Sequence, residues 1–369
     1  MGYPYSPALS IVVPVYNGGP AFRRCLASLK RWALDPNGSL NQAAKEATEE
    51  IDSSTAIEII VVSDGDSDGS WRLAEAFGAR LIRCSESKGP ARARNIGAEA
   101  AKGDILFFVD ADVEILPDTV SQVIKGFQAD PQLAALIGSY DDAPGAPNFL
   151  SQYKNLFHHY THQIARLEAS TFWGACGAIR RSVFQAVGGF NEAYRKPCIE
   201  DIELGYRLKQ AGYTIHLRKD IQVKHLKKWT PLSLLRADVF YRALPWMALL
   251  LRIQQDYPNQ YQQFTSDLNL KWNSRISVML VYGLLLCALI APWWHSALII
   301  AALLGVALTF VNLPVYRFFR QKRGWLFALK AVPWHWLYFF YSGLAYVVMR
   351  ARHQLFTQRL GRSLAWPPA

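Results

Sequence analysis

The stretch Ile-Leu-Phe-Phe-Val-Asp-Ala-Asp, residues 105–112, decides the fold of this chain. Its apolar part predicts a buried strand, and Asp110 and Asp112 follow at the carboxyl end of that strand. Ligands of open α/β sheets bind at the carboxyl ends of the strands. Carboxylate oxygens placed there suit Mg²⁺ or Mn²⁺, which also bind substrate phosphates. By itself, a short Asp-x-Asp segment is better explained as a solvated turn, so the motifs around it decide the interpretation.

Strand-like and helix-like segments alternate around this stretch. Short apolar runs predict strands at residues 11–15, 57–62, 79–83 and 134–140. Helix-like segments lie at residues 22–32, 71–77, 91–101, 118–127, 149–167 and 199–212. This alternation predicts an α/β domain with a parallel, doubly wound sheet. Residues 35–55 are polar and predict a surface insertion, and residues 213–225 predict two short strands.

Two further acidic sites lie at the ends of predicted elements. Asp64 follows the strand at residues 57–62, where its carboxylate can accept hydrogen bonds from a nucleobase edge or form an Asx-type turn. Glu200 and Asp201 open the helix at residues 199–212. A helix dipole favours a carboxylate at its N-terminus, so Asp201 is either a cap or a general base that takes a proton from an attacking hydroxyl.

In combination these motifs resemble family 2 glycosyltransferases. The resemblance covers residues 8–230 and is carried by Ser10–Asn17, Val61–Ser70, Ala93–Ala98, Asp110–Asp112, Gly188–Glu192 and Glu200–Asp201, in the family's order. It implies a GT-A fold, which is Rossmann-like, and inverting transfer of a sugar from a UDP- or GDP-sugar donor. The second motif departs from the family's usual Asp-Asp-Gly-Ser, because Ser63 replaces the first Asp and Asp66 replaces the Ser.

The resemblance assigns roles to residues at matching positions. The donor-binding residues it implies are Pro14, Tyr16, Asn17, Asp64, Lys88, Arg94, Asp110 and Ala111. It implies that Asp112 binds a divalent metal, Mg²⁺ or Mn²⁺, and that Asp201 is the general base. A metal between the phosphates would neutralise the charge that develops on the leaving nucleoside diphosphate.

The segment His225–Trp229 lies where processive polysaccharide synthases carry a Gln-x-x-Arg-Trp motif. This position assigns Trp229 and Lys228, together with Glu200, to the acceptor or donor-sugar region. His225 is either a further metal ligand or a structural histidine.

The remainder of the chain is expected to associate with a membrane. The catalytic domain is predicted over residues 1–230, followed by amphipathic interfacial helices over 231–272 and a membrane region over 273–369. A core-facing helix pair is the alternative for residues 231–272. Within the membrane region, residues 276–294 and 296–315 are each long enough to span a bilayer.

Basic residues on both flanks of these two spans set the expected orientation. Lys271 and Arg275 precede the pair, and Arg317 and Arg320 follow it, so both flanks and the catalytic domain are predicted to be cytoplasmic. A third apolar segment, residues 327–349, is either a span with a translocated tail or a re-entrant or interfacial pair.

The net charge limits the possible binding partners, and the cysteine content indicates the cellular compartment. The net charge is +11, and many basic residues flank apolar segments, which favours an anionic membrane surface over nucleic acid. The five cysteines are scattered without a CxxC pair, which indicates a reducing compartment.

These observations favour an inverting glycosyltransferase that acts on a membrane lipid or lipid-linked acceptor at the cytoplasmic membrane. A processive polysaccharide synthase and a polyprenyl-phosphate glycosyltransferase are the enzymatic alternatives. The few apolar spans argue against a polymer-extruding synthase. A non-enzymatic binding protein is also an alternative, and the intact set of Asp110, Asp112 and Asp201 argues against it. The sequence does not determine the oligomeric state.

Overall fold

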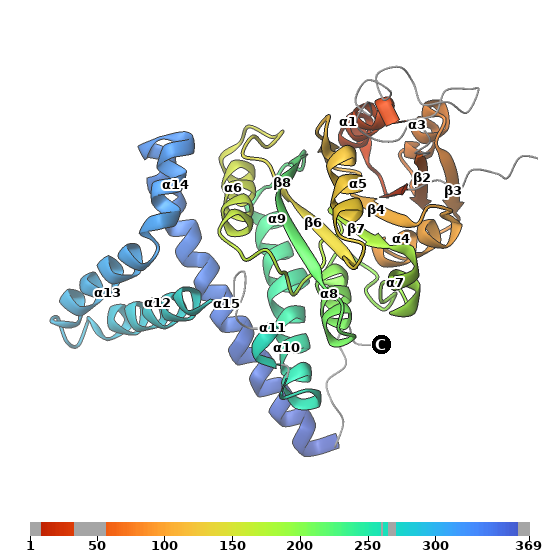
Figure 1. Ribbon diagram of the computed structural model, residues 1–369. Coiled ribbons are helices and arrows are strands. Elements are labelled where there is room, and N and C mark those ends of the chain that lie inside the picture. The colour runs from red at the N-terminus through yellow and green to blue at the C-terminus, as the bar shows by residue number, and fades with distance from the viewer. Residues whose placement is uncertain (1–8, 33–56, 260, 265–270, 361–369) are drawn as a thin grey trace, which may run out of the picture. The chain divides into compact units, whose positions relative to one another are not determined.

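The computed structural model describes residues 9–32, 57–259, 261–264 and 271–360 (Figure 1). The surface insertion predicted at residues 35–55 lies outside these ranges. The chain forms two compact units. The first unit comprises Met1–Pro147 and Ala165–Lys228, and the second comprises Asn148–Ile164 and Trp229–Ala369.

The first unit is built on an eight-stranded sheet with the order β3-β2-β1-β4-β7-β6-β8-β5. The strands are β1 (Leu9–Val15), β2 (Ile57–Asp64), β3 (Arg80–Cys84), β4 (Ile105–Val109), β5 (Val113–Ile115), β6 (Ala135–Tyr140), β7 (Cys176–Arg180) and β8 (Ile215–His225). Strands β1, β2 and β4 are buried along almost their whole length, as expected for strands covered on both faces.

The prediction of an all-parallel sheet is wrong. Strands β3, β2, β1 and β4 are parallel, whereas β7 pairs antiparallel with both β4 and β6, and β5 pairs antiparallel with β8. The parallel half forms through strand-helix-strand crossovers, which bring each strand back in the same direction. Strand β7 follows a long excursion through residues 148–164 and runs the opposite way. Where two short strands are predicted over residues 213–225, the structure has one, β8, whose pairing with β6 shifts register between Ile137 and Ser139.

Helices cover both faces of the sheet in the first unit (Figure 1). They are α1 (Gly19–Leu29), the short 3₁₀ helix η1 (Lys30–Trp32), α3 (Ser70–Phe77), α4 (Pro90–Ala100), α5 (Thr119–Ala129), α7 (Arg181–Ala186) and α8 (Glu200–Gln210). Alternate residues of β1, including Ile11 and Val13, share a core with Phe22 and Cys25 of α1. Val12 points to the other face, where a Cβ added at Gly97 of α4 would lie 2.3 Å from it.

The second unit is helical. It contains α6 (Phe149–Gln163), α9 (Pro231–Arg236), the π-helix η2 (Ala237–Ala243), α10 (Leu244–Asp256), α11 (Tyr261–Phe264), α12 (Trp272–Ile290), α13 (Ala297–Val311), α14 (Leu313–Arg323) and α15 (Trp325–Leu360). The predicted domain boundary placed residues 148–164 with the catalytic domain. They group with the second unit because Tyr153 and Leu156 of α6 share a buried cluster with Tyr316 and Phe319 of α14.

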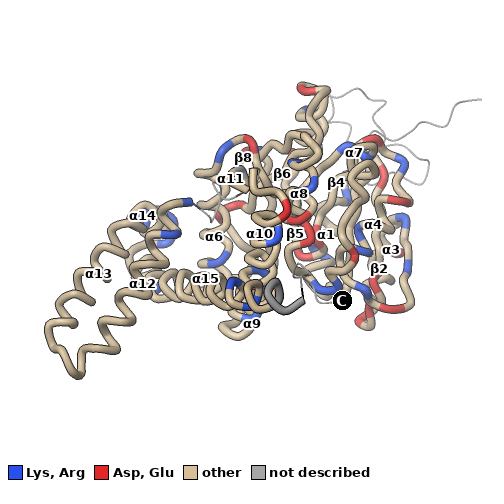
Figure 2. The backbone as a smooth tube through the Cα atoms, turned by 90° about the horizontal axis from the view of Figure 1, so that it is seen from below, with Lys and Arg blue, Asp and Glu red and all other residues tan. Residues whose placement is uncertain are grey.

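Helices α12 and α13 lie side by side and form an apolar hairpin, residues 272–311 (Figure 1). No Asp, Glu, Lys or Arg occurs between Arg275 and Arg317, and Figure 2 shows the hairpin in tan with basic residues in α14. Among the described residues, α12 is the one single helix long and apolar enough to cross a membrane, and α13 with α14 is long and apolar enough as a pair bent by 64°. Helix α15 runs through residues 327–349 as one helix, with Pro333 inside it.

Candidate active site

The first loop of the site connects β1 to α1. Asn17 adopts a left-handed conformation with φ of 50°, which Asn tolerates better than most residues. Its Oδ1 accepts hydrogen bonds from the backbone N–H groups of Ser67 (2.8 Å) and Asp68 (3.2 Å). Asp68 in turn accepts a hydrogen bond from the N–H of Gly19. The two loops that follow β1 and β2 are therefore bound to each other.

Asp64 lies at the end of β2 and is 3% exposed. Its carboxylate accepts hydrogen bonds from Ser87 Oγ (2.8 Å), the N–H of Lys88 (3.1 Å) and the N–H of Gly89 (2.9 Å). These bonds shape the loop that leads into α4. A carboxylate can accept about four hydrogen bonds, and Asp64 already accepts three. One site remains for a further donor, so contact with a nucleobase stays a prediction.

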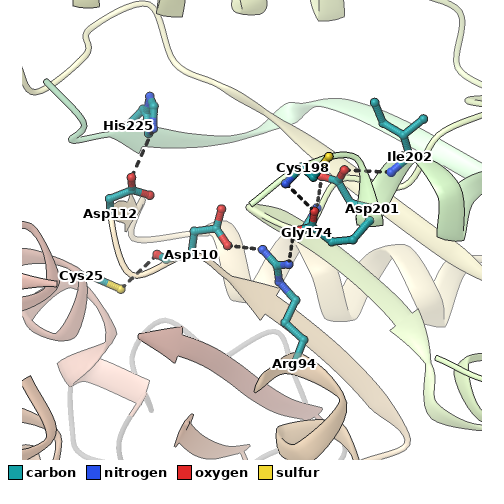
Figure 3. A network of polar contacts seen from close by, with 10 residues as sticks. Cys25, Arg94, Asp110, Asp112, Gly174, Cys198, Asp201, Ile202 and His225 are labelled. Atoms are coloured by element: carbon teal, nitrogen blue, oxygen red, sulfur yellow. Dashed lines mark hydrogen bonds and ion pairs between the residues drawn. The ribbon is translucent and has the colours of Figure 1, made fainter. Parts of the chain in front are cut away.

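The Asp-x-Asp segment forms the tight connection between β4 and β5. The backbone carbonyl of Asp110 accepts hydrogen bonds from the N–H of Val113 (3.0 Å) and from Cys25 Sγ (3.6 Å). This turn directs the two carboxylates to different neighbours (Figure 3). Asp110 faces Arg94, and Asp112 faces His225.

Asp112 and His225 form a pair that fits a cation. Asp112 Oδ2 lies 3.7 Å from His225 Nε2, and the imidazole stacks on Tyr140 with centroids 4.4 Å apart. Burial disfavours the charged form of Asp112, but the contact with His225 and the charge of Lys227 outweigh it and lower the pKa of Asp112 to about 2. Asp112 is therefore ionised at neutral pH.

Arg94 of α4 connects the two acidic sites (Figure 3). The residue is 4% exposed. One guanidinium nitrogen lies 2.6 Å from Asp110 Oδ1, and another lies 2.9 Å from Glu200 Oε1. Burial opposes the charge of Arg94, yet these two carboxylates raise the pKa of the guanidinium above its usual value. The sequence prediction placed Arg94 against the donor base or diphosphate, whereas the structure places its charge between two protein carboxylates.

Asp201 lies in the first turn of α8, next to Glu200. Asp201 Oδ2 accepts a hydrogen bond from the N–H of Gly174 (3.1 Å), and its Oδ1 accepts one from the N–H of Ile202 (2.8 Å). Burial and the adjacent negative charge of Glu200 raise the pKa of Asp201 to about 6, against the opposing effect of Arg94. A carboxylate with this pKa is suited to accept a proton near neutral pH.

Glu200 is held by contacts within the protein. It is 4% exposed, and its second carboxylate oxygen accepts a hydrogen bond from the N–H of Cys198 (2.8 Å). Both oxygens are occupied within the protein because the first contacts Arg94. In the structure Glu200 is a buried anchor of the start of α8, and its contact with an acceptor or donor sugar stays a prediction.

Trp229 also departs from its predicted role. It belongs to the second unit, is 4% exposed and packs against Leu150 and Leu234. The backbone N–H of Trp229 donates a hydrogen bond to Ser151 Oγ (2.7 Å). The indole is therefore buried by the aliphatic side chains around α6 and α9 and presents no face for a sugar.

The remaining residues predicted to bind the donor or acceptor differ in their exposure to solvent. Pro14 is buried within β1, and Tyr16 directly after the strand is 57% exposed. Lys88 is exposed, with its ammonium 2.6 Å from Glu86. Lys228 is exposed, and Ala111 is partly buried between the two aspartates. Donor contact by these residues stays a prediction.

Sequence reasoning missed three residues that position the site. Gly174 holds Asp201 through its N–H, and Tyr140 orients His225. Gly205 of α8 lies against the backbone of Thr171 and Phe172, where an added Cβ would come within 2.1 Å of a backbone nitrogen. The segment around residues 171–179 was identified only as small and apolar. Its glycine at 174 was the available signal.

Together these groups place an ionised carboxylate, a buried cation between carboxylates and a carboxylate of raised pKa around the end of β4 and the start of α8. The fold is that of a glycosyltransferase of the GT-A class. Residues 105–366 match the model of glycosyl transferase family group 2, and residues 10–188 match glycosyl transferase family 2. The chain belongs to the family 2 glycosyltransferases, as its motifs predicted.

Known proteins resemble the chain over different lengths. It is 25% identical over 270 residues to the O-antigen chain rhamnosyltransferase WbaN of Salmonella anatum, covering 68% of this chain and 76% of WbaN. It is 25% identical over 269 residues to the uncharacterized glycosyltransferase YfnE of Bacillus subtilis, covering 58% of this chain and 64% of YfnE. For two other curated relatives, the region that aligns with this chain covers 36% of the length of one and 27% of the length of the other.

Solved structures share the fold. The mannosyltransferase PcManGT of Pyrobaculum calidifontis, in complex with GDP-Man and Mn²⁺, superposes with a TM-score of 0.54 at 18% identity, covering 93% of this chain and 88% of PcManGT. Residues 1–349 of TarS of S. aureus, in complex with UDP-GlcNAc, superpose with a TM-score of 0.50 at 16% identity, covering 93% of this chain and 92% of that one.

Proposed function

We propose that the protein transfers a sugar, with inversion at the anomeric carbon, from a nucleoside-diphosphate sugar to a membrane lipid or lipid-linked acceptor. The observation that carries this proposal is the pairing of two unlike carboxylates in one site. Asp112 is held ionised with a pKa of about 2, whereas Asp201 has a pKa of about 6. Unequal pKa values of this kind separate a charge-binding group from a proton acceptor.

In the proposed reaction, Asp201 removes the proton from an acceptor hydroxyl. The oxygen then forms a bond to the anomeric carbon while the bond from that carbon to the diphosphate oxygen breaks. The electron pair of the breaking bond leaves with the nucleoside diphosphate, and the proton stays on Asp201. A single displacement of this kind inverts the configuration, because attack and departure occur on opposite faces of the sugar.

The residues present fit a divalent metal, Mg²⁺ or Mn²⁺. Asp112 and His225 supply one oxygen and one nitrogen 3.7 Å apart. The described residues contain no group of three or more His, Cys, Asp or Glu side chains that could hold a metal alone. A site with two protein ligands is consistent with an ion such as Mg²⁺, which takes its other ligands from substrate phosphates and water. When bound, the metal would neutralise charge on the departing diphosphate.

The apolar hairpin supports a membrane location for the acceptor. Large apolar side chains on it are exposed, among them Met279 (63%), Leu289 (67%) and Leu303 (64%). Trp293 at its turn is 80% exposed, as expected for an indole in a membrane–water interface. Basic residues at the end of α14 suit an anionic membrane surface. We propose that the catalytic unit faces the cytoplasm, following the basic flanks of the hairpin.

The requirement for a general base distinguishes two classes of acceptor. A lipid or saccharide hydroxyl must lose a proton, whereas the phosphate of a polyprenyl phosphate is already ionised and needs no base. The raised pKa of Asp201 suits it to act as a base, which favours an acceptor that carries a hydroxyl group. Two relatives are O-antigen chain rhamnosyltransferases, which makes a nucleoside-diphosphate rhamnose an early donor to test.

The test uses protein purified in detergent with Mn²⁺ or Mg²⁺, a panel of nucleotide sugars and a membrane lipid extract. Released nucleoside diphosphate and glycosylated lipid are measured together, with Asp201→Asn as the control. We expect one donor to give a lipid product in equal amount to the nucleotide released, and no product from the variant. A ladder of products would indicate a processive synthase. Nucleotide binding without turnover of any donor would contradict the proposed function.

A further inference from the structure

The strongest unassigned feature is the buried guanidinium of Arg94. In the described structure it contacts Asp110, the first residue after β4, and Glu200, the first residue of α8. These two residues are far apart in sequence and belong to the two halves of the site. Only 5% of the side chains of Arg94 and Glu200 is exposed, so both are shielded from competing solvent.

The guanidinium also lies against the residue that holds Asp201. A Cβ added at Gly174 would lie 3.0 Å from the Arg94 guanidinium carbon, so the guanidinium packs closely against this glycine and would have to shift for a larger residue. The N–H of Gly174 donates its hydrogen bond to Asp201. Arg94 therefore contacts the donor-side aspartate, the anchor of α8 and the backbone that orients Asp201 (Figure 3).

We propose that Arg94 is a positioning residue that couples the donor-side carboxylate Asp110 to the start of α8 and thereby sets the place of the general base Asp201. This inference rests on the proposed function. A planar guanidinium can hold two carboxylates in fixed directions at once, which an ammonium cannot do. Arg94 acts through Asp110 and Glu200 and makes no contact with the reacting atoms.

The coupling has an electrostatic signature at Asp201. The charged groups that act on Asp201 are Glu200 on its own helix and Arg94 on α4, with opposite effects. Replacing Glu200 by Gln removes the negative charge, so the midpoint of the acidic limb of kcat/KM moves to lower pH. Replacing Arg94 by Met removes the positive charge, so that midpoint moves to higher pH.

The experiment compares Arg94→Lys, Arg94→Met, Glu200→Gln and the double variant Arg94→Met/Glu200→Gln with the wild type. Arg92→Met is the matched control, because Arg92 lies on the same helix and its side chain is 33% exposed. We expect kcat to fall at least about tenfold in Arg94→Lys and Glu200→Gln, with less than threefold change in the nucleoside diphosphate Kd. The double variant should lose less than the product of the single losses, because the two residues act as a unit.

Two results would overturn the proposal. One is a tenfold weaker nucleoside diphosphate Kd in Arg94→Lys with unchanged kcat, which would assign Arg94 to donor contact. The other is an acidic limb that does not move, or that moves in the same direction in Glu200→Gln and Arg94→Met. Arg92→Met should match the wild type in every readout.

A readout without turnover separates this inference from the proposed function. Each variant is paired with the same variant carrying Asp201→Asn, and the stability difference within the pair is followed against pH. Its midpoint reports the titration of Asp201. Shifts in opposite directions support the positioning role even if no donor is turned over, whereas unshifted midpoints refute it. Glu200→Gln keeps the shape of the side chain, so its titration midpoint still tests the proposal if the Arg94 variants do not fold.

Discussion

Asp201 is partly buried beside another carboxylate, and this environment gives the residue both its proposed chemistry and a cost in stability. Its pKa is raised from 3.8 to about 6. At neutral pH the folded protein therefore holds a carboxylate that is ionised but ready to accept a proton. Asp112, in the same site, is held ionised by His225 and Lys227.

The first prediction concerns the pH dependence of turnover. Replacing Asp201 by Asn should lower kcat by about 10²–10⁴-fold, the usual contribution of a general base. In the wild type, kcat/KM should fall below a pH of about 6, where Asp201 becomes protonated. Initial rates between pH 5 and 9 test this prediction. An acidic limb near pH 4, or a fully active variant, would exclude Asp201 as the base.

The second prediction concerns stability at the same residue. A carboxyl whose pKa is raised by folding stabilises the fold below its unfolded pKa, and this contribution is lost as the pH rises through about 6. Asp201→Asn should therefore be more stable than the wild type at pH 8, by about 1–3 kcal/mol, and equally stable near pH 4. Thermal unfolding at both pH values measures the difference. Lower stability of the variant at pH 8 would contradict the burial of an ionised Asp201.

The third prediction addresses the proposed metal ligands. His225→Ala should raise the Mn²⁺ concentration for half-maximal turnover at least about tenfold, which corresponds to about 1.4 kcal/mol of binding free energy. His216→Ala is the control, because His216 lies on the same strand away from Asp112. An unchanged Mn²⁺ requirement in His225→Ala would assign His225 a structural role.

At the scale of elements, helix α8 is positioned by a close backbone contact at Gly205. The segment it touches, residues 171–172, leads directly to Gly174 and so to the hydrogen bond that Asp201 accepts. Sequence periodicity located α8 and its acidic start, because both depend on local pattern. It could not locate this contact, because a glycine inside a helix gives no signal of what lies opposite it.

The same limit explains the other differences between sequence and structure. The alternation of strands and helices predicts a parallel sheet but gives no sign of the antiparallel strand β7, because the small apolar residues before and within it carry no clear strand pattern and a hydrophobic pattern does not determine strand direction. The motifs identified Asp110, Asp112 and Asp201 one by one. Arg94 joins Asp110 to Glu200, the neighbour of Asp201, and Tyr140 stacks on His225, which faces Asp112. These partners are set by long-range packing.

The fourth prediction tests a buried ion pair in the π-helix η2. Asp238 is 5% exposed and contacts Lys154 Nζ at 2.6 Å and Tyr341 Oη at 2.7 Å. Asp238→Ala should destabilise the protein by about 3–5 kcal/mol, because it leaves the Lys154 charge buried without its partner. Asp256→Ala is the control, since it removes an exposed pair with Arg252 that is worth at most about 1 kcal/mol. Equal melting temperatures of the two variants would contradict this account.

At the scale of the whole molecule, an α/β catalytic unit is combined with a helical unit that exposes a long uncharged hairpin. The fifth prediction tests membrane insertion of this hairpin. Leu303→Arg should cost about 2.5–3.5 kcal/mol at the centre of a bilayer and release the protein from vesicles washed with carbonate. Leu167→Arg is the control, because Leu167 is similarly exposed but belongs to the catalytic unit. Retention of both variants on the vesicles would exclude insertion at Leu303.

The central claim, inverting transfer of a sugar with Asp201 as the base, is tested most directly by proton NMR of the reaction with the active donor. The account predicts that the anomeric signal of the donor is replaced by a product of opposite configuration, and that Asp201→Asn forms no product. A product that retains the configuration of the donor, or one formed at the wild-type rate by Asp201→Asn, would contradict the claim.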